Sequence, residues 1–245
     1  APLRDSMLRQ QRRARSTAEQ QRVDEDIFRQ TQEEIAVGRM SPFLDPQHES
    51  ARFLPVTRRF GVVQETSTGK TKVRCIDDFA ASGVNDTTSV RKRISAGRVT
   101  RLVESSRVLA ETRPQDRQLL LKSDFKGAYR ACPIAADHLD FTFVAVRDPR
   151  SHAVRLSRQL ATPFGAVGAV YAWDRVAEFI VEVLRREFAL PIERYVDDIF
   201  LVDFADTAQF ARDIMIEVVE AFGLFLEPTK TPEPSTTMVI LGVRV

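Results

Sequence analysis

Residues 195–198, which read Tyr-Val-Asp-Asp, place two carboxylates side by side. Apolar runs lie on both sides, at residues 190–195 and 199–204, and they are rich in residues that favour strands. We therefore expect a hairpin with Asp197 and Asp198 at its tip. Neighbouring carboxylates repel each other, and a hard divalent cation such as Mg²⁺, which prefers oxygen ligands, would relieve that repulsion.

A third carboxylate, Asp124, closes the apolar run at residues 119–121. Two strands that each bring a carboxylate to the same point can form a two-metal site for phosphoryl transfer. A structural role is the alternative, because aspartates are common in turns, where they accept hydrogen bonds from nearby backbone N–H groups. An Asp-Asp pair taken alone leaves both roles open.

Several motifs follow one another in the order found in reverse transcriptases, and together they resemble that family. Residues 195–198 resemble its active-site hairpin, and residues 124–129, an aspartate with Tyr129 five positions later, resemble its first palm motif. Four more segments resemble, in turn, the second motif, the fourth motif, the primer grip and the fingers: residues 163–165, 223–230, 240–242 and 72–85. The resemblance covers residues 58–245, and the ordered set is far more specific than any single motif.

The resemblance implies an RNA-directed DNA polymerase that adds deoxynucleotides to a primer 3′-end on an RNA or DNA template. Its metal ligands would be Asp124, Asp197, Asp198 and the main-chain carbonyl of Phe125, holding two Mg²⁺ ions for which Mn²⁺ can substitute. Asp124 and Asp197 would bridge both ions, with Asp198 as a weaker ligand. Lys230 would protonate the departing pyrophosphate.

The same resemblance assigns residues to the nucleotide and the primer. Lys70 or Lys72 would grip the triphosphate together with Arg74, whose guanidinium fork suits phosphate oxygens. The ring of Tyr129 would leave no room for a ribose 2′-hydroxyl, which favours deoxynucleotides. Phe164 and Gly165 would lie below the templating base pair. Leu241 and Gly242 would lie at the primer grip.

The implied fold is α+β, with the fingers and palm of a right-hand polymerase. We expect an N-terminal helical extension and linker at residues 1–51, a fingers-like subdomain at 52–118 and a palm with the start of the primer grip at 119–245. The palm would be ferredoxin-like, an antiparallel sheet backed by helices, because strand, helix, hairpin, helix and strand follow in that order. No segment resembles a thumb, so a protein partner or a further C-terminal region would have to replace it.

Apolar periodicity predicts where the elements of this fold lie. Strands at residues 60–63 and 72–76 are expected to pair as one hairpin, and strands at 141–146 and 153–159 as another. Further strands are expected at 119–125 and 238–245. One or two helices are expected within 1–37, and one each at 96–113, 165–188 and 203–222. Asp206 or Thr207 would cap the last helix, which Gly223 would follow.

Composition narrows the class of protein. The net charge of +2 is unevenly spread, because residues 52–130 hold 17 Lys and Arg against 8 Asp and Glu, whereas residues 131–245 hold 11 against 17. The basic half would contact phosphates and the acidic half would hold metal ions. No apolar stretch has the length of a membrane span, and Cys75 and Cys132 lack the spacing of a metal site. We expect an intracellular protein with reduced thiols and no membrane partner.

Two other functions stay open at this point. A domesticated reverse-transcriptase-like subunit could serve as a scaffold in a larger complex without using its catalytic residues. An RNA-dependent RNA polymerase is disfavoured by Tyr129 and by Tyr195 ahead of the aspartate pair, and extension with ribonucleotides but not deoxynucleotides would favour it.

Overall fold

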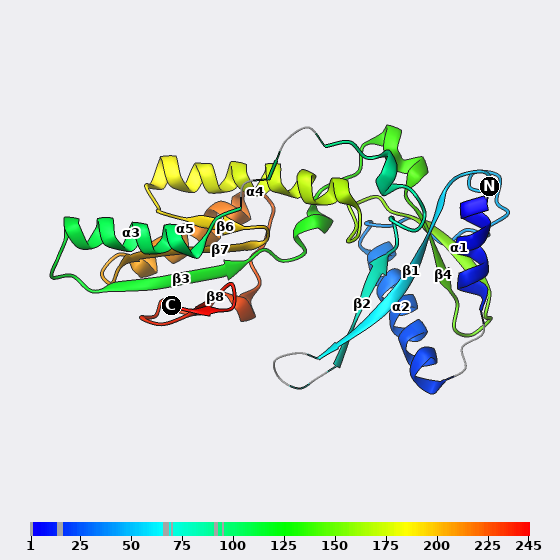
Figure 1. The fold of residues 1–245 in the computed structure, drawn as a ribbon, viewed down its shortest axis with the longest axis horizontal. Coiled ribbons are helices and arrows are strands. Elements are labelled where there is room, and N and C mark those ends of the chain that lie inside the picture. Colours follow the sequence, from blue (N-terminus) through cyan, green and yellow to red (C-terminus); the bar gives the residue numbers. More distant parts are fainter. Residues whose placement is uncertain (1, 14–16, 66–68, 70, 91–92, 95) are drawn as a thin grey trace. The chain divides into compact units, whose positions relative to one another are not determined.

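Helices and strands are mixed along the chain in an α+β fold in which antiparallel pairing dominates. The computed structural model describes residues 2–13, 17–65, 69, 71–90, 93–94 and 96–245 (Figure 1). The chain forms two compact units, Ala1–Arg91 with Tyr129–Val170, and Lys92–Ala128 with Tyr171–Val245. Each unit is built from two separate stretches, whereas the sequence predicts consecutive segments, and the division into fingers and palm stays a prediction.

The first unit contains a four-stranded sheet in the order β2-β1-β4-β5. Its elements are α1 (Pro2–Arg12), α2 (Ala18–Ala36), β1 (Val56–Glu65), β2 (Thr71–Asp77), η1 (Asn85–Thr87), η3 (Ala136–Phe141), β4 (Phe143–Arg147) and β5 (Val154–Arg158). The β1–β2 and β4–β5 hairpins are both predicted by the sequence and confirmed. Their joining is not predicted: β4 pairs in parallel with β1, so the second hairpin lies in the same sheet as the first.

Strand β4 explains why the two hairpins join. All five of its residues are buried, as in a strand that is covered on both faces. Phe143 and Ala145 pack in one core cluster with Leu8 of α1, and Val144 and Val146 pack in another with Ile27 of α2. The sequence predicts one or two helices within residues 1–37, and the structure has two. Each contributes to a core on one face of this sheet.

The second unit contains a three-stranded antiparallel sheet in the order β3-β7-β6 (Figure 1). Its elements are α3 (Val99–Thr112), β3 (Gln118–Asp124), β6 (Glu193–Tyr195), β7 (Asp198–Phe204), α5 (Ala208–Ala221), η4 (Pro228–Lys230), β8 (Val239–Ile240) and β9 (Val243–Arg244), together with most of α4 (Val167–Phe188). The short helix η2 (Ala128–Ala131) begins at the boundary between the units. Leu120 of β3 and Phe200 of β7 share a core cluster with Leu102 of α3 and Ile240 of β8.

Two elements differ in their bounds from the sequence prediction. Residues 238–245 form a small hairpin instead of a single strand, because Leu241 and Gly242 both take positive φ angles, 49° and 80°, as a type I′ turn requires. Helix α5 begins at Ala208 instead of residue 203, because β7 continues to Phe204. Thr207 is its N-cap residue, but its side chain makes no capping hydrogen bond.

No helix within the part of the chain that the structure describes is long and apolar enough to cross a membrane.

Candidate active site

The β6–β7 hairpin turns within two residues. Tyr195 pairs with Asp198, so Val196 and Asp197 form the loop and Asp198 is already the first residue of β7. The prediction that both aspartates lie at the tip is therefore wrong for Asp198. The regular pairing of β7 with both neighbours extends one residue further toward the tip than the apolar pattern indicates.

The backbone of this turn is strained. Val196 has a φ of +56°, a region that β-branched residues rarely adopt, and Asp197 is not among the residues with positive φ, as in a type II′ turn, where Gly is preferred at the first position. A non-Gly residue in this conformation costs about 1–3 kcal/mol and persists where its surroundings fix it. The strain therefore lies next to the carboxylate predicted to bridge both metal ions.

Three hydrogen bonds, all accepted by carbonyl oxygens of the turn, hold it in place. The indole Nε1 of Trp173 donates to the Val196 carbonyl at 2.9 Å, and Nη1 of Arg194 donates to the same oxygen at 3.1 Å. The backbone N–H of Phe125 donates to the Asp197 carbonyl at 3.0 Å. The end of β3, helix α4 and strand β6 thus all hold the loop.

Asp124 and Asp198 lie directly opposite each other on β3 and β7. Directly opposed residues in an antiparallel pair place their side chains on the same face, with Cβ atoms about 4.5–5.5 Å apart. Burial raises the pKa of Asp198, and the negative charges of Asp197 and Asp124 raise it further. Three carboxylates therefore interact electrostatically at one end of the sheet, as predicted from the sequence.

Lys230 supplies a positive charge in direct contact with Asp124. Residues 225–227 run along the free edge of β3, where the Glu227 N–H donates to the Asp124 carbonyl at 2.8 Å, and η4 follows directly. This places Lys230 Nζ 2.5 Å from Asp124 Oδ2, and the bond raises the pKa of the lysine. The sequence predicts Lys230 as a site residue, but it does not indicate an ion pair with Asp124.

The three carboxylates have the chemistry that Mg²⁺ prefers, although they do not form a closed ligand shell. Within the described ranges, no group of three or more His, Cys, Asp or Glu is arranged so that it could hold a metal ion directly. Burial is the main cause of the raised pKa of Asp198, and the neighbouring charges of Asp197 and Asp124 add to it. A divalent cation would offset both effects. Asp124, Asp197 and Asp198 are the residues that would hold it, with hard oxygen donors throughout.

Arg194 is a site residue that the sequence does not reveal. It is 3% exposed and lies on β6, immediately before the Tyr195–Asp198 pair. Besides the Val196 carbonyl, its guanidinium contacts two carboxylates of α4, Asp174 Oδ1 at 2.5 Å and Glu178 Oε2 at 3.2 Å. The available signal was the charged pair Glu193-Arg194, which interrupts the apolar run at residues 190–195. A buried arginine requires such partners.

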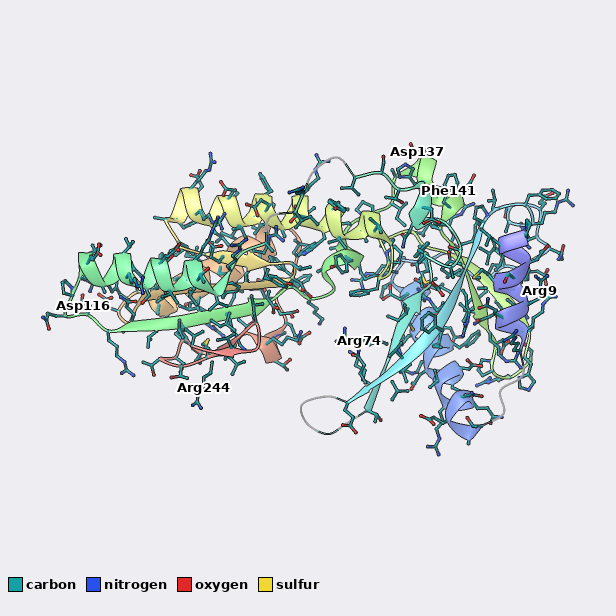
Figure 2. The ribbon with its side chains drawn as sticks, in the orientation of Figure 1. Arg9, Arg74, Asp116, Asp137, Phe141 and Arg244 are labelled. Carbon is teal, nitrogen blue, oxygen red and sulfur yellow. The ribbon has the colours of Figure 1, made fainter. Side chains whose placement is uncertain are left out.

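The residues predicted to contact the nucleotide belong to the first unit. The rings of Tyr129 and Phe164 pack edge to face with centroids 5.0 Å apart. Lys72 and Arg74 are exposed on one face of β2, and Arg74 projects from the hairpin (Figure 2). Lys70 lies outside the described residues.

Gly165, Leu241 and Gly242 all take positive φ angles, which side chains other than hydrogen disfavour. Gly165 has a φ of +101°, and a side chain there would meet the backbone carbonyl oxygen of Asp77. Leu241 and Gly242, predicted at the primer grip, form the tip of the β8–β9 hairpin.

No protein-family model matches the chain, and a search of curated proteins finds no significant match. Function is therefore inferred from the motifs and from the geometry of the side chains.

Proposed function

We propose that the chain is a reverse transcriptase, adding deoxynucleotides to a primer 3′-end on a nucleic-acid template. The observation that carries this proposal is the direct opposition of Asp124 and Asp198 on neighbouring strands, with Asp197 in the strained turn beside them. Carboxylates brought together from two strands can hold the ions of two-metal phosphoryl transfer. The strand order β3-β7-β6, with the hairpin between α4 and α5, is also the order expected of a polymerase palm.

Each residue has a defined task in this proposal. Asp124, Asp197 and Asp198 would hold Mg²⁺, which supplies Lewis-acid stabilisation of charge on the phosphates. Lys230, whose raised pKa keeps it protonated, can donate a proton to the departing pyrophosphate. Tyr129 would exclude the 2′-hydroxyl of a ribonucleotide, which distinguishes this activity from that of an RNA-dependent RNA polymerase.

Primer extension tests the proposal. The full chain is given an RNA template, a DNA primer and either dNTPs or rNTPs, with Mg²⁺ or Mn²⁺. Asp197→Asn keeps the size of the side chain but removes its charge, and we expect extension to fall by at least about 100-fold.

The matched control is Asp203→Asn, at the other end of β7, where the aspartate accepts a hydrogen bond from its neighbouring N–H. Extension by rNTPs alone, or equal extension by wild type and Asp197→Asn, contradicts the proposal. Template binding without extension in either metal favours a scaffold.

A further inference from the structure

We infer that the ion pair between Glu34 of α2 and Arg130 positions the Tyr129–Phe164 ring pair, and through it sets the preference for deoxynucleotides over ribonucleotides. The inference rests on the proposed polymerase function and extends it. It gives a role in substrate selection to α2, a helix that precedes every motif resembling the polymerase family. Arg130 is the positioning residue, and it acts through Tyr129.

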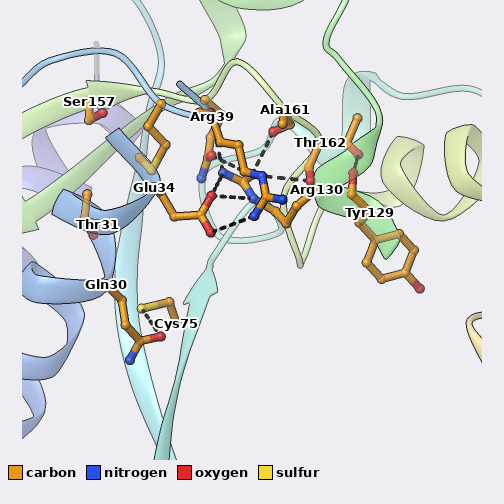
Figure 3. Close-up of polar contacts among 12 residues, drawn as sticks. Gln30, Thr31, Glu34, Arg39, Cys75, Tyr129, Arg130, Ser157, Ala161 and Thr162 are labelled. Carbon is orange, nitrogen blue, oxygen red and sulfur yellow. Dashed lines mark hydrogen bonds and ion pairs between the residues drawn. The ribbon is translucent and has the colours of Figure 1, made fainter. Parts of the chain in front are cut away.

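Arg130 is buried and its guanidinium is fully engaged in bonds to fixed groups (Figure 3). Its Nη2 and Nε donate to Glu34 Oε2 at 2.6 and 3.0 Å. Its Nη1 donates to the Ala161 carbonyl at 2.8 Å and to Gln159 Oε1 at 2.9 Å. One side chain thus ties α2 to the segment that precedes Phe164.

The two segments held by Arg130 carry the two rings. Tyr129 is its immediate chain neighbour, and the Thr162 hydroxyl donates to the Tyr129 carbonyl at 2.5 Å. Phe164 lies two residues beyond Thr162 and packs edge to face on the Tyr129 ring. The backbone on both sides of the ring pair is therefore fixed by one hydrogen-bonded cluster, shown in Figure 3.

A second route links the same cluster to the residue after Phe164. Gln159, which is fully buried, donates from Nε2 to Asp77 Oδ2 at 2.7 Å, and Asp77 forms a buried ion pair with Arg59 at 2.7 Å. The backbone of Asp77 packs so closely on Gly165 that a side chain at position 165 would collide with it. The residue after Phe164 is thus packed against Asp77, which is hydrogen-bonded to the Arg130 cluster through Gln159.

Loss of the Glu34 carboxylate would leave the buried guanidinium of Arg130 without its anionic partner. Such a group shifts to find water or another acceptor, because an unpaired buried charge is costly. Any shift of Arg130 moves its neighbour Tyr129. A steric filter that must distinguish a hydroxyl from a hydrogen is sensitive to small displacements, since a misplacement of about 1 Å can cost about 100-fold in an enzyme reaction.

The test compares Glu34→Gln with Glu33→Gln in the full chain. Glu33 lies on the same helix, but its ion pair with Arg29 is exposed. The measured quantity is the ratio of the kcat/KM values for dNTP and for rNTP incorporation. We expect the ratio to fall by about tenfold in Glu34→Gln, because this variant displaces Arg130 and with it the ring of Tyr129. The ratio should stay unchanged in Glu33→Gln, because Glu33 pairs with Arg29 and not with Arg130. Arg130→Lys, which keeps the charge but loses the planar fork, should lower the ratio as well.

A second readout does not depend on activity. The chain has three tyrosines, so 3-fluorotyrosine labelling gives three ¹⁹F NMR signals, and Tyr129→Phe identifies the one of interest. Glu34→Gln should move the Tyr129 signal, and Glu33→Gln should not. If Glu34→Gln and Arg130→Lys fail to fold, Thr162→Val removes the hydroxyl bonded to the Tyr129 carbonyl and should lower the same ratio.

The outcomes separate this inference from the proposed function. Absence of nucleotide incorporation by the wild type contradicts the function, while the NMR comparison still tests the positioning. A wild type that incorporates dNTPs, together with an unchanged ratio in Glu34→Gln, or in Thr162→Val if that variant is needed, overturns the inference. An unmoved Tyr129 signal in the folded Glu34→Gln variant also overturns it.

Discussion

Replacing Arg194 by Met tests how the turn that carries Asp197 is held. Methionine has an unbranched apolar side chain that resembles the aliphatic stem of arginine, but it lacks the guanidinium. It therefore removes the bond to the Val196 carbonyl and both ion pairs to α4, with Asp174 and Glu178. We expect a large loss of stability and a loosened turn.

The size of the effect follows from burial. Removing one partner of a buried ion pair costs about 3–5 kcal/mol, because the remaining charge has no partner. The Asp174 and Glu178 side chains remain 22% and 46% exposed, so water can solvate the carboxylates that are left behind. The lower end, about 3 kcal/mol, therefore applies, and for a chain of this length it corresponds to a fall in Tm of about 6–12 °C.

Urea unfolding followed by circular dichroism measures the free energy, and fluorescence of the single tryptophan reports the turn. Trp173 donates to the same Val196 carbonyl as Arg194, so its emission should change in folded Arg194→Met. Arg186→Met is the matched control, because Arg186 is 78% exposed and pairs with Glu182 one helical turn away. That pair is worth at most about 0.5 kcal/mol. Equal unfolding free energies for the two variants, or unchanged emission, would refute the reasoning.

Three further changes test separate features. Gly165→Ala should lower the free energy of unfolding, measured in the same urea assay, by about 2 kcal/mol or more, because the added Cβ meets the Asp77 carbonyl. Gly38→Ala is the control: Gly38 has a φ of +74° but open space around it, so this change should lower the free energy of unfolding by only about 1 kcal/mol. Lys230→Gln should change the free energy of unfolding by less than about 1 kcal/mol, since the Lys230 side chain is 59% exposed. The same variant should slow primer extension by about 100-fold, and an unchanged rate would exclude Lys230 as the proton donor. Burial raises the pKa of Cys75 to about 11, so at pH 8 iodoacetamide should alkylate it about 100-fold more slowly than an ordinary thiol, with urea restoring the rate, as measured by peptide mass spectrometry.

Local patterns in the sequence were sufficient to predict most helices and hairpins. The apolar periodicity places α3, α4 and both long hairpins correctly, because these elements follow from residues close together in the chain. The motif at residues 195–198 likewise predicts a hairpin there and the convergence of Asp124 with the aspartate pair. What these features share is that each depends on one element or on one pair of neighbouring strands.

Long-range partner choice could not be predicted in the same way. The parallel pairing of Val56 with Phe143 depends on which sheet edge is free, and no local pattern encodes that. The Glu34–Arg130 pair joins residues far apart in sequence, and each alone resembles an ordinary surface charge. The one-residue error at Asp198 has a different cause, since alternation of polar and apolar residues does not fix where a turn closes.

The order in which the chain is synthesised has a consequence for the parallel β1–β4 pair. The β1–β2 hairpin is complete at Asp77, but its partner begins at Phe143, so residues 78–142 must emerge first. At about 5–20 residues per second, the ribosome needs about 3–13 s to make them. During that interval the β1 edge is unpaired and open to other chains. Cellular yield should therefore respond to translation speed and to chaperones that cover nascent strands, more than to changes in the finished site.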